Sequence, residues 1–314
     1  MKESLKIGEI IAESGTKAKG FLKVPNTSVQ IPIVIVNGLQ EGPTLLVTAG
    51  IHGGEYPCIE AGIRFGRELD PGQVRGQAII VAPVSLNAFL ARQAFWVPED
   101  GKNLNRVFPG KATGTISERM AYTLMTEVVP HANAWIDLHG GDIPEALVPF
   151  SIYCESPDPQ ITAESRQLAA AFGIEYLVRS PNTGTTTAAA AGAGIPGILA
   201  EAGQLGILDE ENTQILLHGC WNVARHLGII QGNVTPSALK EFQNWPWIRA
   251  SHTGCWYPQV KVGDTVDQNQ LVGCVKDYFG EILAEYRAPA SGVVLLLCMA
   301  MSVKDSDPLI GIAF

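Results

Sequence analysis

The chain has 314 residues, of which 46% are hydrophobic and 17% charged, the balance of a globular protein with one large or two ordinary domains. Its 31 acidic and 22 basic residues give a net charge of -9, and no lysine or arginine cluster interrupts this acidic excess. The distribution argues against nucleic acid or an anionic membrane as a partner and favours a small-molecule substrate.

The amino-terminal sequence and the cysteines bear on location. The first residues, MKESLKIGEI, contain no apolar stretch of the kind found in signal peptides, and no run of about 18 apolar residues occurs in the chain. The six cysteines form no C-x-x-C pair, as is typical of free thiols in a reducing compartment. We therefore expect a cytoplasmic protein, and the sequence leaves homo-oligomerisation open.

Short β-branched runs fill the first part of the chain. Residues 29–36 (VQIPIVIV) and 42–50 (GPTLLVTAG) flank Asn37-Gly38, a dipeptide typical of tight turns. We expect these two runs to pair as a β-hairpin.

Strands and helices then alternate up to residue 229. Buried-strand patterns predict strands at residues 76–84, 132–141, 175–180 and 195–203. Helical spacing predicts helices at residues 58–69, 117–129 with Ser117 as the cap, 163–173 ending at Gly173, 185–194 and 210–229. This alternation is typical of an α/β domain whose mostly parallel or mixed sheet carries helices on both faces.

The pattern changes after a proline-bearing, non-periodic stretch that ends near residue 247. From there to the end, the sequence contains only short strand-like runs separated by glycine turns. We therefore predict an α/β catalytic domain over residues 1–240 and a small all-β domain over residues 241–314.

Polar side chains follow two of the predicted strands. His52 and Glu55 lie in a glycine-rich loop between a strand and a helix, and His139 ends another strand. Ligands of open α/β sheets bind beyond the carboxyl ends of the strands, so these three side chains can converge. Two imidazoles and one carboxylate, with a position left for water, suit catalytic zinc. The pattern predicts one zinc ion per chain, although His52 alone also fits a histidine satisfied by backbone groups.

Two further acidic residues lie near strand ends. Asp137 is two residues before His139, hence on the same side of the strand, where it could orient the imidazole or simply cap a neighbouring turn. Glu201 ends the apolar run GILAE, where a carboxylate is costly unless it is paired or takes part in chemistry. We predict that Glu201 is the general base for the attacking water, the alternative being an ion pair with a helix arginine.

The loop GKNLNRVFPG, residues 101–110, offers groups that bind a carboxylate. Asn105 and Arg106 supply an amide and a planar guanidinium, which suit a substrate carboxylate. Arg92, downstream of the strand at 76–84, is the candidate for stabilising the developing oxyanion. Either arginine could instead be an ordinary surface charge.

The motifs GIHGGEYP, NLNRVFPG, DLHGG and AEAG occur in this order and resemble those of the succinylglutamate desuccinylase/aspartoacylase family of zinc-dependent hydrolases, relatives of the zinc carboxypeptidases. The resemblance spans roughly residues 30–314 and implies the same roles for the seven candidate residues. It also implies a carboxypeptidase-like core followed by a β-domain that overhangs the active site.

The predicted β-domain has a resemblance of its own. Residues 260–275 and 288–294 are similar to the hammerhead fold of biotinyl and lipoyl domains, but no lysine stands where a prosthetic group would be attached. We expect this domain to form a wall of the substrate pocket rather than to carry a group.

Together these observations predict zinc-dependent hydrolysis of the amide bond in an N-acyl amino acid or a related small N-acylated amine. The alternatives are a metallocarboxypeptidase acting on peptides and a non-catalytic small-molecule binder on the same fold. A covered pocket would exclude long peptides, and a binder has no need of a buried base such as Glu201. The acyl group and the amine stay open.

Overall fold

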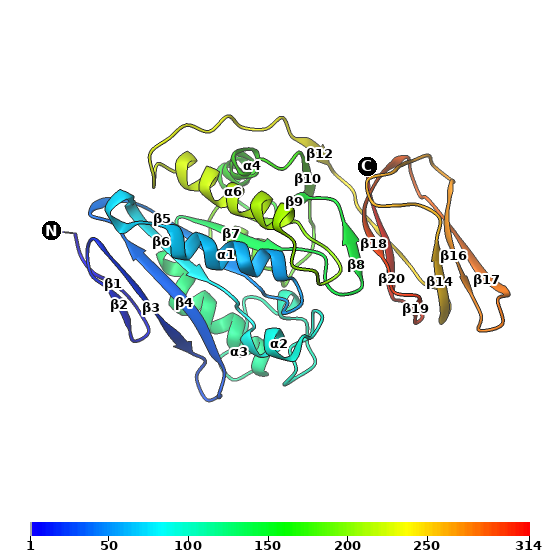
Figure 1. The fold of residues 1–314 in the computed structure, drawn as a ribbon, viewed down its shortest axis with the longest axis horizontal. Coiled ribbons are helices and arrows are strands. Elements are labelled where there is room, and N and C mark those ends of the chain that lie inside the picture. Colours follow the sequence, from blue (N-terminus) through cyan, green and yellow to red (C-terminus); the bar gives the residue numbers. More distant parts are fainter. Residues whose placement is uncertain (1) are drawn as a thin grey trace.

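The computed structural model describes residues 2–314 and has a nine-stranded mixed sheet at its centre (Figure 1). In spatial order the strands are β12 (Lys240–Phe242), β10 (Tyr176–Arg179), β9 (Phe150–Tyr153), β11 (Gly197–Glu201), β7 (Ala134–His139), β5 (Gln40–Ala49), β6 (Arg75–Val81), β4 (Gln30–Asn37) and β3 (Thr16–Lys23). Neighbours are parallel except in the pairs β9–β11, β6–β4 and β4–β3. This sheet confirms the predicted α/β class. The strands β1 (Leu5–Ile7) and β2 (Ile10–Ala12) form a separate antiparallel pair.

Helices cover both faces of the sheet. The helices are α1 (Tyr56–Glu68), α2 (Leu86–Ala91), α3 (Ile116–Thr123), α4 (Pro159–Phe172), α5 (Thr186–Gly192) and α6 (Glu210–His226). Apolar side chains of α1, α4 and α6 share one buried cluster with the sheet, and those of α3 and α5 share another. The two clusters are the cores above and below the sheet. Within residues 2–314, no helix has the length and apolarity needed to cross a membrane.

The predicted hairpin between the first two long strands is wrong. Strand β6 lies between β4 and β5, pairing antiparallel with β4 and parallel with β5. The second half of β5 is buried throughout, and such strands belong in the middle of a parallel sheet, covered on both faces. The hairpin partner of β4 is the preceding strand, β3.

Helix α4 ends at a left-handed Gly173, as predicted, whereas the predicted cap of α3 is wrong. The N-cap of α3 is Thr115, and the Glu118 carboxylate accepts a hydrogen bond from the Thr115 backbone N–H at 2.8 Å in a capping box. Ser117 lies in the first turn instead, where its hydroxyl donates to the Asp100 carboxylate.

The carboxy-terminal part is all-β, as predicted, and lies at one end of the molecule (Figure 1). One of its sheets contains β13 (Trp247–Arg249), β20 (Pro308–Ala313), β18 (Gly292–Cys298) and β15 (Thr265–Val266); the other contains β17 (Ile282–Arg287), β16 (Leu271–Lys276), β14 (Gly254–Pro258) and β19 (Ser302–Val303). Strand β8 (Glu145–Leu147), from the middle of the chain, pairs with β18. Strand β12, in the nine-stranded sheet, spans the predicted boundary at residue 240. The two parts are therefore joined by strand pairing as well as by the connecting chain.

Three parallel central strands bring distant residues to one edge of the sheet. Strand β7 lies between β5 and β11, and Glu201 at the end of β11 pairs with His139 at the end of β7. Ala49, the last residue of β5, lies one position behind, opposite Leu138. The loop that follows β5 therefore opens beside both strand ends, where ligands of such sheets bind.

Candidate active site

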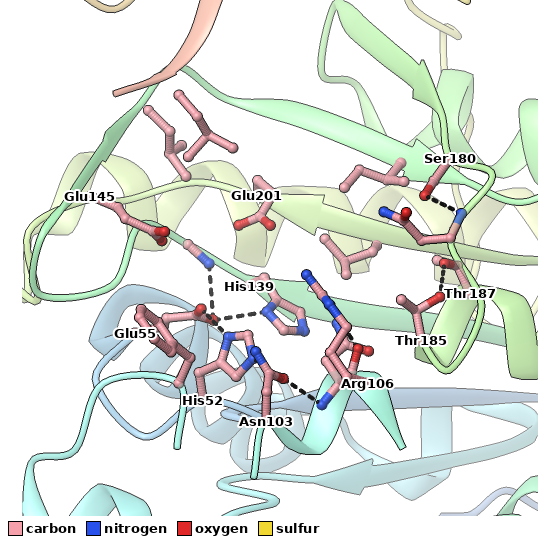
Figure 2. A pocket seen from close by; sticks show the side chains of 18 of the residues that line it. His52, Glu55, Asn103, Arg106, His139, Glu145, Ser180, Thr185, Thr187 and Glu201 are labelled. Atoms are coloured by element: carbon pink, nitrogen blue, oxygen red, sulfur yellow. Dashed lines mark hydrogen bonds and ion pairs between the residues drawn. The ribbon is translucent and has the colours of Figure 1, made fainter. Parts of the chain in front are cut away.

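His52, Glu55 and His139 form a compact cluster at this edge (Figure 2). Glu55 Oε1 lies 2.7 Å from His52 Nδ1, and Glu55 Oε2 lies 3.0 Å from His139 Nδ1. Nitrogen and oxygen atoms of the three residues lie within 4.8 Å of one another. Two imidazole nitrogens and a carboxylate at such separations fit a divalent cation, and this donor set is common at catalytic zinc.

The loop between β5 and α1 needs glycine to place these ligands. Gly50 has a φ of 72°, a left-handed conformation that lets the chain turn sharply at the end of the strand. A Cβ at Gly53 would collide with the backbone of Ala88 and Phe89, so only glycine fits there. The glycines thus let the loop fold tightly against α2 and deliver His52 and Glu55 to the sheet edge.

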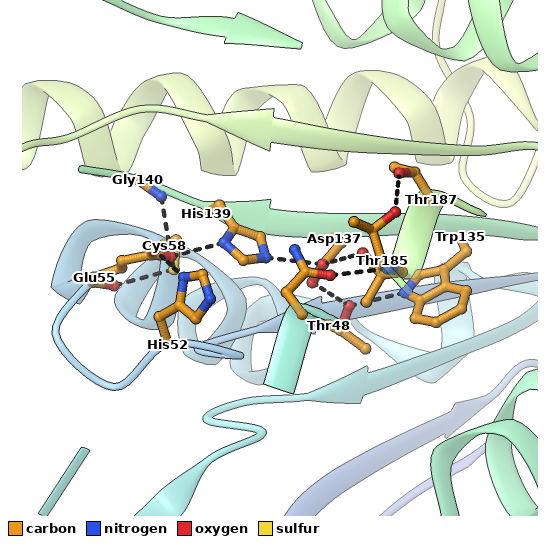
Figure 3. A network of polar contacts seen from close by, with 12 residues as sticks. Thr48, His52, Glu55, Cys58, Trp135, Asp137, His139, Gly140, Thr185 and Thr187 are labelled. Atoms are coloured by element: carbon orange, nitrogen blue, oxygen red, sulfur yellow. Dashed lines mark hydrogen bonds and ion pairs between the residues drawn. The ribbon is translucent and has the colours of Figure 1, made fainter. Parts of the chain in front are cut away.

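Asp137 anchors His139 from behind (Figure 3). Its carboxylate accepts hydrogen bonds from Thr48 Oγ1 at 2.6 Å and Thr186 Oγ1 at 2.5 Å, and it lies 2.9 Å from His139 Nε2. An acceptor at Nε2 keeps the proton on that nitrogen and leaves Nδ1 free to act as a ligand. Asp137 is therefore the imidazole-orienting residue of the two roles considered from the sequence, not the cap of a turn.

Asn103 contacts His52 in a similar way, and sequence reasoning missed it. Its Oδ1 lies 3.1 Å from His52 Nε2 and accepts a hydrogen bond from the Asn105 backbone N–H at 2.8 Å. The bonded loop therefore orients the second imidazole. The only signal for Asn103 in the sequence is that it is the first asparagine of the motif N-L-N-R, two residues before Asn105.

The charges of the cluster stabilise one another. Burial opposes ionisation of Glu55, yet the adjacent His139 and His52 lower its pKa to about 2. Burial likewise opposes protonation of His139, but the Glu55 and Asp137 carboxylates raise the pKa of this imidazole well above its usual value. The Glu55 carboxylate therefore stays ionised, and together with Asp137 it favours a positive charge between the side chains of the cluster.

Glu201 faces the same cavity as the histidines (Figure 2). Its Oε2 atom is buried and has no hydrogen-bond partner among residues 2–314, so the alternative of an ion pair at this atom is not realised. Burial raises the pKa of Glu201 well above its usual value; His139 opposes this shift, and Glu55 and Glu145 add to it. The carboxyl group therefore binds a proton more readily than an ordinary glutamate side chain does.

The cavity has a volume of about 130 Å³ and is lined by both parts of the chain. Trp245, Trp247 and Leu296, from the carboxy-terminal part and the segment leading to it, form one side of it. Ser180 and the hydroxyls of Thr185 and Thr187 lie on another side (Figure 2). The dimensions and the polar lining suit a small metabolite.

The predicted carboxylate-binding residues reach the cavity, whereas Arg92 does not. Asn105 is buried in the lining, with its Oδ1 bonded to the Thr186 backbone N–H at 2.9 Å. Arg106 stands at the rim with its guanidinium donating to the Asn105 carbonyl at 2.7 Å. Arg92 is an exposed residue with a φ of 52° that ends α2, and it is not among the lining residues. The structure therefore does not bring Arg92 to the other predicted site residues.

Two further residues line the cavity, and neither was predicted from the sequence. Phe95, three residues after Arg92, lines the cavity, and its ring centroid lies 6.4 Å from that of His52. Glu145, on β8, also lines the cavity. Nothing in the local sequence marks Glu145, because its place depends on the pairing of β8 with a strand about 150 residues later.

The sequence resembles known proteins over most of its length. Residues 41–227 match the family model of the succinylglutamate desuccinylase/aspartoacylase catalytic domain. An N-alpha-acetyl-L-2,4-diaminobutyric acid deacetylase from Halomonas elongata is 30% identical over 311 residues, which covers 94% of this chain and 90% of that protein.

Solved structures resemble the chain over nearly its whole length. The product-bound ectoine utilization protein EutE (DoeB) from Ruegeria pomeroyi superposes with a TM-score of 0.87 at 26% identity, covering 95% of each chain. A succinylglutamate desuccinylase/aspartoacylase from Rhodobacter sphaeroides has a TM-score of 0.84 at 26% identity, covering 100% of this chain and 96% of its own.

Proposed function

Because this chain belongs to the succinylglutamate desuccinylase/aspartoacylase family, we propose that it is a zinc-dependent deacylase that hydrolyses the linear amide bond of a small N-acyl amino acid. The observation that carries the proposal is the pairing of a two-histidine, one-carboxylate cluster with a carboxyl group that has a free buried oxygen in the same cavity. A ligand set beside an unpaired acid is the minimum equipment for metal-assisted hydrolysis.

In this proposal His52 and His139 hold the cation through their Nδ1 atoms, and Glu55 holds it through its carboxylate. Zinc bound there would polarise the acyl carbonyl and make a water more acidic. Asp137 and Asn103 keep both imidazoles in the required orientation from the far side of each ring.

Glu201 is the proposed general base and acid. Its raised pKa lets it accept a proton from the attacking water and then donate that proton to the leaving nitrogen. Transfer to nitrogen is needed because an amine leaves readily only after protonation. Tetrahedral collapse then gives a carboxylate and a free amine.

Arg106 and Asn105 are the proposed binding groups for the substrate carboxylate. Among residues 2–314, Arg106 is the one arginine or lysine that lines the cavity. The relative from Halomonas elongata is named for an N-acetylated diamino acid, so N-acetyl-diamino acids are the first substrates to test. With one cation available, a substrate bearing a single carboxylate suits the cavity best.

The rival functions are less well supported. The cavity is small, about 130 Å³, and Trp245 and Trp247 line it, which disfavours long peptides and hence a carboxypeptidase. A buried Glu201 oxygen without a hydrogen-bond partner among residues 2–314 costs stability, and a simple binding protein has no use for such a group.

We further propose a cytoplasmic location. All six cysteines are free and four of them are buried, which suits a reducing compartment. Cell fractionation with an antibody against the protein would test this location.

The decisive experiment measures amine release from a panel of N-acyl amino acids by zinc-loaded and chelator-treated protein. Glu201→Gln should lower kcat by about 10²- to 10⁴-fold while the zinc content stays at one per chain. The matched control is Glu60→Gln on α1. The Glu60 carboxylate lies 2.6 Å from Arg64 Nε and does not line the cavity, so this variant should keep full activity. Full activity of Glu201→Gln, or activity that survives chelation, would contradict the mechanism.

A further inference from the structure

Glu145 lines the cavity but has no role so far. It is neither a metal ligand nor the general base, and it is not one of the groups proposed to bind the substrate carboxylate. It points into the cavity near Glu55 and Glu201 (Figure 2). Within residues 2–314 its carboxylate has no ion pair or hydrogen bond, and only its backbone groups are bonded. A carboxylate in such a site is costly unless something that enters the cavity pairs with it.

The backbone holds Glu145 in place without help from its side chain. Its N–H donates to the Asp142 carbonyl at 2.8 Å, and its carbonyl accepts from the Leu205 N–H at 2.8 Å. Opposite it, Cys298 of β18 fixes the register of the strand. The carboxylate is thus presented to the cavity by a backbone anchored on three sides, which lowers the entropic cost of binding a partner.

The balance of charge in the cavity indicates which partner fits. Apart from the proposed metal ligands, the ionisable side chains that line the cavity within residues 2–314 are Glu145, Glu201 and Arg106. A substrate carboxylate would satisfy Arg106, and Glu201 is reserved for proton transfer. Glu145 is then left without a counter-charge, and a second substrate carboxylate would add repulsion.

We propose that Glu145 binds a primary ammonium group of the substrate and thereby selects N-acyl diamino acids over N-acyl dicarboxylic amino acids. Arg106 and Glu145 reach the cavity from different sides, with Glu201 between them in the view of Figure 2. A zwitterion with its carboxylate at Arg106 and its ammonium at Glu145 would span the cavity across the reacting amide. This assignment rests on the proposed function, because it concerns the substrate of the same site.

Three N-acetyl amino acids of similar size test the assignment: Nα-acetyl-2,4-diaminobutyrate, N-acetyl-2-aminobutyrate and N-acetylaspartate. Wild-type protein should show kcat/KM at least tenfold higher for the diamino substrate than for the neutral one, and lowest for the dianion. Glu145→Gln should remove this preference by raising KM for the diamino substrate about 10- to 100-fold, the range expected for a charged hydrogen bond. The loss of kcat/KM on the neutral substrate should be smaller, by about tenfold, than the loss on the diamino substrate.

Controls separate ammonium binding from a structural role. Glu60→Gln should keep the wild-type ranking, and Glu145→Asp, which keeps the charge, should restore part of the preference. Equal losses by Glu145→Gln on the diamino and neutral substrates would overturn the proposal, as would a wild-type preference for N-acetylaspartate.

A binding measurement keeps the assignment testable apart from catalysis. Calorimetry on the zinc-loaded wild-type protein should show tighter binding of 2,4-diaminobutyrate than of 2-aminobutyrate, by tenfold or more. If no substrate were cleaved, the proposed deacylase function would be wrong. The comparison of the two affinities would still test the proposed ammonium site. Equal affinities for the two amino acids would overturn the ammonium site, whether or not the variant proteins fold.

Discussion

Replacing Asp137 by asparagine tests how the site controls His139. Asp137 is 1% exposed and its two oxygens face two hydroxyl groups and one imidazole nitrogen. Asparagine keeps the shape but has a single acceptor oxygen and no charge, so it cannot accept from Thr48 on one side and from Thr186 and His139 Nε2 on the other, as the carboxylate does. The imidazole then loses the negative charge that holds its proton on Nε2.

The expected effect is a weaker metal site rather than an unfolded protein. Loss of a carboxylate behind a ligating histidine typically lowers metal affinity about 10- to 100-fold, which corresponds to about 1.4–2.7 kcal/mol. Leaving one hydroxyl or ring N–H unsatisfied should cost about 1–3 kcal/mol of folding free energy. Both losses are small enough for the variant to be purified.

Competition with a chromophoric zinc chelator measures the affinity, and thermal unfolding of the metal-free protein measures stability. The matched control is Asp209→Asn at the N-cap of α6, where asparagine caps as well as aspartate and both measurements should stay unchanged. Zinc affinity of Asp137→Asn equal to wild type would refute the proposed orientation of His139, as would an equal loss in the control.

Two further predictions concern Asn103 and Glu145. Asn103→Ala removes the 3.1 Å contact with His52 Nε2 and should lower zinc affinity about tenfold in the same competition assay, and unchanged affinity would show that the loop does not orient His52. Burial, together with Glu55 and Asp142, raises the pKa of Glu145 to about 7, so between pH 4.5 and 7 the folded protein binds more protons at this site than the unfolded chain. Stability should therefore fall as pH rises through this window, by up to about 3 kcal/mol from this group, and Glu145→Gln should flatten that slope in metal-free protein. Denaturant titrations at several pH values measure the slope, and identical slopes for both proteins would contradict the assigned burial of the carboxylate.

The sequence allowed much of the site to be predicted because parallel strands end at a common edge. His139 and Glu201 end neighbouring strands, and His52 follows the strand on the other side of β7. These residues converge because their strands are neighbours in the sheet. The strands themselves are recognisable in the sequence as hydrophobic runs. Asp137 was found for a related reason, since residues two apart on a strand face the same side.

Other features depend on long-range packing that local patterns do not reveal. The runs at 29–36 and 42–50 carry a turn dipeptide, yet β6 inserts between them in the sheet. Arg92 follows a predicted strand, but it is itself the left-handed residue that ends α2, and it is exposed to solvent. Glu145 reaches the cavity because its strand pairs with β18, a contact that no local spacing announces.

The central claim is that one divalent cation binds between His52, Glu55 and His139. Crystals of zinc-loaded protein, with anomalous diffraction measured on both sides of the zinc absorption edge, test it most directly. We predict a single strong anomalous peak per chain at about 2.0–2.1 Å from Nδ1 of each histidine, with the Glu55 carboxylate completing the protein ligands. A peak elsewhere, or coordination through Nε2 of His139 with Asp137 displaced, would contradict the account.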